Sequence, residues 1–166
     1  MLIAVDTNVL MDFAVDDGDV MDAVQTIRAR LKTARFVVTP TVIQELANLY
    51  ERGADEARGA AERALRDMLG WGFEPMNLIP AGHGIVEQIS LRLRILNILP
   101  EEEVGDGLII AEAALMGCQM LLTADHHMLD AQEHPRFRKA LEESDVEGSL
   151  VIARPRYIVK HFFRQK

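Results

Sequence analysis

The chain has 166 residues, which fits one domain able to bury a sizeable core without disulfides or a structural metal. Hydrophobic residues make up 49% and aromatic residues 5%, so we expect a mainly aliphatic core. The one cysteine, Cys118, is expected in that core; it excludes an internal disulfide framework and fits a reducing cytoplasm. Apolar stretches end before the ~20 residues that a membrane-spanning helix needs, so no membrane contact is expected. The N-terminal run is interpreted as a strand and not as a signal peptide.

The formal net charge is −8, which counts against a nucleic-acid binder because such proteins are usually basic. The charge is unevenly distributed, however. Residues 149–166 contain no acid and five basic residues: Arg154, Arg156, Lys160, Arg164 and Lys166. Acids gathered at a metal site also lower the net charge without repelling phosphate, since a bound cation reverses the local sign. The basic tail could contact nucleic acid or form the solvated face of a terminal helix.

The predicted elements alternate between short aliphatic strands and amphipathic helices, with no internal repeat or long linker. In chain order, strands are expected at 2–5, 36–38, 73–79, 120–123 and 149–152. Helices are expected at 8–16, 19–33, from 39–40 onward, 55–69, 83–97, 104–117, shortly after 125, at 135–143 and at 155–163. This alternation predicts a three-layer α/β/α sandwich with a mostly parallel central sheet. We expect a single domain over 1–166, with a C-terminal extension from about 146.

Four acids lie where such a fold would bring them together. Asp6 directly follows the first strand, and Asp125 lies two residues after the fourth, so both carboxylates converge if these strands are neighbours. Asp106 lies near the start of a helix, and Glu45 interrupts an apolar helical pattern. Hard divalent cations take oxygen ligands, activate water and stabilise charge at phosphorus. Apposed carboxylates are costly unless they are paired or bind metal, so the set favours a metal site.

Each acid also has a purely structural interpretation. Asp6, Asp106 and Asp125 could each cap the helix that follows, and Glu45 could be a solvated helix residue. His83 lies between two glycines and is expected in a loop. Lesser candidates, each with a simpler polar or packing interpretation, are Asp12 and Asp130 as outer metal ligands, His126 or His127 as a phosphate or metal contact, and Trp71 as a base-stacking residue.

Four segments carry a family resemblance, and they agree in order and spacing from the first residue to about 130. They are Ala4–Leu10, Thr39–Leu46, Gly105–Ala111 and Leu121–Asp125. On these segments the chain resembles the PIN-domain family, which includes the VapC-like ribonuclease toxins of toxin–antitoxin pairs. The resemblance implies Mg²⁺ or Mn²⁺ bound by four acids: Asp6, Glu45, Asp106 and Asp125. It also implies that Asn8 and Thr123 support this site.

The expected function is therefore a divalent-metal-dependent ribonuclease that hydrolyses RNA phosphodiester bonds with water and no covalent intermediate. The resemblance further implies an antitoxin protein and a second copy of the chain as partners. The alternative is a catalytically silent PIN module that binds RNA or a protein. A phosphatase of the haloacid-dehalogenase type also begins with a strand ending in Asp, but it needs a second Asp where this chain has Asn8. The RNA target and the number of metal ions stay open.

Overall fold

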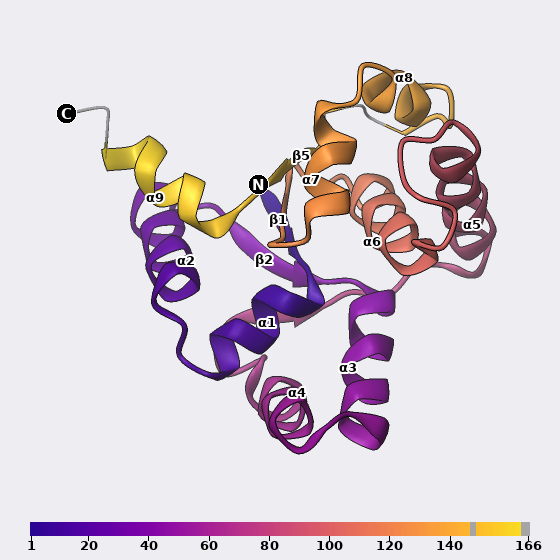
Figure 1. Cartoon of the computed structure of the whole chain (residues 1–166). Coiled ribbons are helices and arrows are strands. Elements are labelled where there is room, and N and C mark those ends of the chain that lie inside the picture. Colours follow the sequence, from indigo (N-terminus) through magenta and orange to yellow (C-terminus); the bar gives the residue numbers. More distant parts are fainter. Residues whose placement is uncertain (147–148, 164–166) are drawn as a thin grey trace.

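A five-stranded parallel sheet forms the centre of the molecule (Figure 1). The structure is a computed structural model that describes residues 1–146 and 149–163; Arg164 and Lys166 of the basic tail lie outside them. The strands are β1 Leu2–Val5, β2 Arg35–Val38, β3 Phe73–Pro75, β4 Met120–Leu122 and β5 Val151–Ala153. Every neighbouring pair is parallel, in the order β3-β2-β1-β4-β5. The expected fold class is confirmed.

Helices cover both faces of this sheet. Within the described residues they are α1 Thr7–Ala14, α2 Gly18–Arg30, α3 Pro40–Arg52, α4 Asp55–Asp67, α5 Pro80–Ile95, α6 Val104–Leu115, α7 His126–Glu133, α8 Phe137–Glu142 and α9 Pro155–Phe163. One group comprises α1, α2, α4 and α9, and the other comprises α5, α6, α7 and α8. The two groups flank the strands in Figure 1, while α3 contacts both α4 and α6.

The central strands are apolar at consecutive positions because both of their faces are covered. Ile3, Ala4 and Val5 of β1 are completely buried, without the alternation of a half-exposed strand. In β4 the same holds for Leu121 and Leu122. The core is aliphatic, as the composition predicts, and Cys118 is buried within it.

Two predicted elements differ from the structure around Pro75. The strand expected over 73–79 ends at Pro75, because its partner β2 ends at Val38, the residue opposite Pro75. The missing N–H of Pro75 is tolerated because β3 is an edge strand. The Met76 N–H still donates to the Val38 carbonyl at 2.9 Å, and the chain then leaves the sheet. Helix α5 begins at Pro80, a favoured first helical residue, so His83 lies in this helix and not in a loop.

The C-terminal part adds a strand and a helix to these layers. Strand β5 pairs with β4; it begins two residues later and ends one residue later than predicted. Helix α9 packs against α2. Ile152 of β5 and Ile158 of α9 are both buried. Within the described ranges, no helix combines the length and apolar character needed to cross a bilayer.

Candidate metal centre

The candidate site lies at the carboxyl ends of β1 and β4. These strands are neighbours, with Val5 opposite Leu122, so the adjacency on which the predicted convergence depends is confirmed. The backbone N–H of Asp6 donates to the Leu122 carbonyl at 2.9 Å, which fixes the first acid beside the end of β4. From β1 the chain continues to β2 on one side, and from β4 it continues to β5 on the other side. Open α/β sheets bind ligands at such switch points.

A cavity of about 340 Å³ opens at this edge. The residues that line it come from the end of β1, from α1, α3 and α6, and from the residue before α7: Asp6, Thr7, Asn8, Met11, Asp12, Glu45, Leu49, Asp106 and Asp125. The structure thus brings all four predicted acids to one cavity and adds Asp12, a lesser candidate. None of these lining residues is Lys, Arg or His, so no lining side chain offsets the carboxylate charge.

A hydrogen-bond network holds Asp6, whose residue is only 3% exposed. Its Oδ2 accepts from the Thr123 hydroxyl at 2.6 Å and from the Asn8 side-chain amide. The Thr123 oxygen in turn accepts from the Asp125 backbone N–H at 2.9 Å, and Asn8 Oδ1 accepts from the Ala124 N–H at 3.0 Å. Thr123 and Asn8 therefore tie the ends of β1 and β4 together around one carboxylate.

Asp6 and Asp125 also cap helices, as the structural interpretation of each expected. Asp6 Oδ1 accepts from the Thr7 N–H at 2.7 Å at the start of α1. Asp125 Oδ1 accepts from the His127 N–H at 2.7 Å and the Met128 N–H at 3.2 Å at the start of α7. The caps fix these carboxylates at the cavity, so capping and lining the site are compatible here.

Glu45 is half-buried, and it is not the solvated helix residue of the alternative interpretation. The Thr7 hydroxyl donates to its Oε2. On the other side, a Cβ built on Gly105 would lie 2.7 Å from Glu45 Oε1, so α6 approaches this carboxylate closely. The side chain is therefore held between the start of α1 and the start of α6.

Asp106 lies in the first turn of α6 and does not cap it, because the N-cap position belongs to Glu103. Its Oδ2 is buried without a hydrogen-bond partner. Burial, followed by the charges of Asp125 and Asp6, raises the pKa of Asp106 to about 8. Burial likewise raises the pKa of Asp6 to about 6, and that of Glu45 above its ordinary value. Without a cation, these groups hold protons more tightly than exposed carboxyls do.

The donor set fits a hard divalent cation. It consists of carboxylate oxygens, includes the unpartnered Oδ2 of Asp106, and has no cationic side chain in its lining. No three His, Cys, Asp or Glu side chains in the described part of the chain are already drawn together as a ligand set. The acids thus border a shared cavity without meeting at one point.

The other lesser candidates do not line this cavity. His127 does not line the cavity; its Nε2 lies 3.4 Å from Glu103 Oε1, and its ring centroid lies 3.8 Å from that of His126. Asp130 is not among the lining residues. Trp71 packs against Phe13, with ring centroids 5.2 Å apart, as its packing interpretation expected.

Sequence reasoning missed two polar residues that join helices bordering the cavity. Thr7 belongs to the recognised N-terminal segment, but its contact with Glu45 spans 38 positions and leaves no local pattern. Glu112 is buried in α6 and hydrogen-bonded to Thr41 of α3. A lone acid in the apolar run from Gly107 to Leu115 was the available signal for Glu112.

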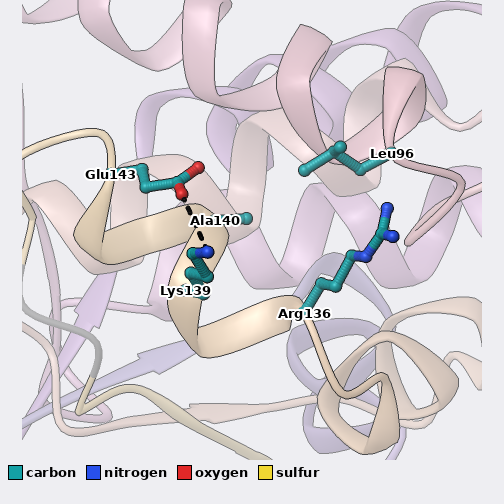
Figure 2. Close-up of a pocket in the computed structure, with 5 residues that line it drawn as sticks. All are labelled: Leu96, Arg136, Lys139, Ala140 and Glu143. Carbon is teal, nitrogen blue, oxygen red and sulfur yellow. Dashed lines mark ion pairs between the residues drawn. The ribbon is translucent and has the colours of Figure 1, made fainter.

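A second hollow, of about 300 Å³, lies between α5 and α8. Figure 2 shows its lining residues: Leu96, Arg136, Lys139, Ala140 and Glu143. The dashed line marks the ion pair between Lys139 Nζ and Glu143 Oε1, which are 3.6 Å apart. Arg92 also lies 3.7 Å from Glu143. The one carboxylate here is already paired with cations, so this hollow does not offer a second metal-ligand set.

Comparisons with known proteins agree with the fold that carries this site. The family model for the PIN domain matches residues 3–134. No curated protein matches the chain in sequence.

Several solved structures share the fold. VapBC2 from Rickettsia felis, bound to a DNA fragment from its promoter, has a TM-score of 0.64 and 12% identity, covering 93% of this chain and 98% of that one. VapBC-1 from nontypeable Haemophilus influenzae has a TM-score of 0.55 and 14% identity, covering 79% and 92%. FitAB bound to an IR36 DNA fragment has a TM-score of 0.52 and 16% identity, covering 92% and 94%. At these identities the similarity shows a shared fold.

Proposed function

Because the chain belongs to the PIN-domain family, a family of nucleases, we propose that it is a divalent-metal-dependent ribonuclease. The observation that carries the proposal is the cavity at the ends of β1 and β4, which five carboxylates line and no Lys, Arg or His does. Such a site repels a phosphodiester until a cation reverses its charge. RNA as the substrate follows from the family resemblance, since the carboxylates alone would serve DNA equally well.

In this proposal four acids hold one or two Mg²⁺ or Mn²⁺ ions, some of them through water: Asp6, Glu45, Asp106 and Asp125. A bound cation of this kind supplies an activated water and stabilises charge on the phosphate. Thr123 and Asn8 orient the Asp6 carboxylate, and Thr7 orients that of Glu45. The buried Oδ2 of Asp106 is free to accept a ligand.

Water is the proposed nucleophile because the hydroxyls nearest the acids are already engaged. Thr7 donates to Glu45, and Thr123 donates to Asp6, so neither is poised to attack phosphorus. Asn8 bridges Asp6 and the backbone of Ala124. A haloacid-dehalogenase phosphatase has its second Asp at this position, whereas here the Asn side chain supports the site.

Cleavage of a labelled mixed RNA pool tests the proposal. Wild type is expected to cut with Mn²⁺ or Mg²⁺ and not with EDTA, and Asp6→Asn to lose at least roughly 100-fold of that activity while staying folded. Asp22→Asn, the same change at an exposed position of α2, is the matched control. No cleavage by folded wild type with either metal would favour a silent binding module, and full activity of Asp6→Asn would overturn the site.

We also propose that the protein acts in the cytoplasm as the toxin of a toxin–antitoxin pair and forms a homodimer. Support for the toxin–antitoxin pair comes from the similar structures, which are VapBC and FitAB assemblies. The homodimer is what the family resemblance implies, and the cytoplasm is what the cysteine usage favours. Induced wild type should arrest growth, Asp6→Asn should not, and the product of a small gene immediately upstream should relieve the arrest. Light scattering after size exclusion would measure the oligomer, and a monomer at micromolar concentration would contradict the homodimer.

A further inference from the structure

Glu112 is a buried carboxylate that the proposed reaction does not use. It lies near the end of α6 and is 3% exposed. Both oxygens are bonded to Thr41 of α3: Oε2 accepts from the backbone N–H at 3.1 Å, and Oε1 accepts from the hydroxyl at 2.8 Å. A buried carboxylate is costly unless its oxygens are hydrogen-bonded, and here both oxygens are. The two-point contact therefore fixes α3 and α6 relative to each other.

These bonds cap α3 from the neighbouring helix. The first N–H groups of a helix have no partner within it. Thr39, at the N-cap position, makes no side-chain capping bond, and Pro40 has no N–H. Glu112 supplies both the missing acceptor and a negative charge, which a helix N-terminus favours.

The cap lies one helical turn from the candidate site. Thr41 and Glu45 are four residues apart and share one face of α3. Glu45 Oε1 closely approaches Gly105 of α6, and Asp106 is the next residue. The contact between α3 and α6 therefore extends from Glu112 to Glu45 and Asp106, two of the carboxylates that border the cavity.

We propose that Glu112 is a positioning residue: it holds the first turn of α3 against α6, so that Glu45 and Asp106 face the same cation. This inference rests on the proposed metal site. It requires the affinity for metal, and not only the stability of the fold, to depend on the hydrogen bonds between Glu112 and Thr41.

Four variants separate these hydrogen bonds from packing and stability. Glu112→Gln can keep both contacts, because its oxygen accepts from the Thr41 N–H and its amide donates to the hydroxyl. Glu112→Met has a similar size and makes neither bond. Thr41→Val removes only the hydroxyl. Leu141→Ala, in the buried face of α8, is the control for general destabilisation.

Mn²⁺ affinity, measured by calorimetry on the folded full chain, is the readout, with the melting temperature recorded alongside. Glu112→Met should weaken Mn²⁺ binding by about 10–100-fold, and Thr41→Val by less. Glu112→Gln should bind nearly as wild type, and Leu141→Ala should lower the melting temperature without changing affinity. If Glu112→Met does not fold, the Mn²⁺ affinities of Thr41→Val and Glu112→Gln are compared instead, and Thr41→Val should bind more weakly.

Asp6→Asn distinguishes the ways in which this inference can fail. If wild type and Asp6→Asn bind Mn²⁺ equally, or wild type binds none, the proposed site and the positioning role are both overturned. If wild type binds and Asp6→Asn does not, while Glu112→Met and Thr41→Val bind as wild type, the site stands and the positioning role is overturned.

Discussion

At the scale of single residues, the burial of carboxylates and their mutual repulsion limit the stability of the metal-free protein. Burial and the neighbouring acids raise the pKa of Asp106 to about 8, whereas an Asp in an unfolded chain titrates near ~3.9. The folded state therefore binds this proton more tightly than the unfolded state. Its contribution to stability is complete below about pH 4 and is lost as the pH rises through about 8.

Asp106→Asn should consequently stabilise the metal-free protein more at pH 9 than at pH 5.5. The cavity is open to solvent, which screens the repulsion, so we expect a gain of about 2–4 °C, the shift that ~1 kcal/mol produces in a domain of this size. Thermal unfolding in EDTA measures it, with Asp22→Asn as the control. An equal gain at both pH values would contradict the prediction. In excess Mn²⁺ wild type should become the more stable of the two proteins, because only wild type gains binding energy from the metal.

Gly105 allows a second residue-scale prediction. A Cβ at this position would meet only the end of the flexible Glu45 side chain, so Gly105→Ala should fold normally and displace that carboxylate. Mn²⁺ affinity should fall roughly tenfold. Gly59→Ala in α4, where a Cβ meets nothing within 4 Å, should bind Mn²⁺ as wild type and gain ~0.5–1 kcal/mol of stability. Unchanged affinity in Gly105→Ala would show that Glu45 tolerates displacement.

At the scale of elements, α7 begins at a carboxylate that also borders the cavity, and two substitutions separate these uses. Asp125→Asn should keep the cap, because Asn is as good an N-cap as Asp, and lose Mn²⁺ affinity. Asp125→Ala should lose both, with a further cost of ~1 kcal/mol in unfolding free energy. Denaturant unfolding in EDTA compares them. Equal stability of the two variants would mean that the cap contributes nothing.

Elements whose signal lies within one run of residues were predictable. The apolar runs ending at Asp6 and near Asp125 identified β1 and β4, and Pro40 marked the start of α3. The end of β3 was not predictable, because residues 76–79 are compatible with a strand while the partner strand β2 ends at Val38, opposite Pro75. The glycines beside His83 suggested a loop, although both lie in helix α5, which packs against α6.

The gathering of the four acids was predictable for a different reason. The family resemblance placed Glu45 and Asp106 in the same metal site as the other two acids. The adjacency of β1 and β4 explains the convergence of Asp6 and Asp125. The contacts that hold them were not predictable, because Glu112 meets its partner Thr41 across 71 positions. Such hydrogen bonds form only when two helices pack together. The sequence therefore shows the donors and acceptors but not which of them are partners.

At the scale of the whole molecule, β5 and α9 contribute to the same sheet and helix layer as the N-terminal part. Strand β5 covers the edge of β4, and α9 packs on α2. We therefore propose that the chain unfolds as one cooperative unit. A second transition in calorimetry would contradict this.

Ile158 and Tyr157 of α9 test how strongly this last helix is coupled to the rest. Ile158 is 8% exposed, and its neighbour Tyr157 is 59% exposed. Ile158→Ala should lower the unfolding free energy by ~2–5 kcal/mol, because buried apolar volume is lost, whereas Tyr157→Ala should change it by less than ~0.5 kcal/mol. Both are measured on the single transition of the full chain. If Ile158→Ala costs no more than Tyr157→Ala, α9 is only loosely attached, and the C-terminal part behaves as an appendage whose folding the metal site does not need.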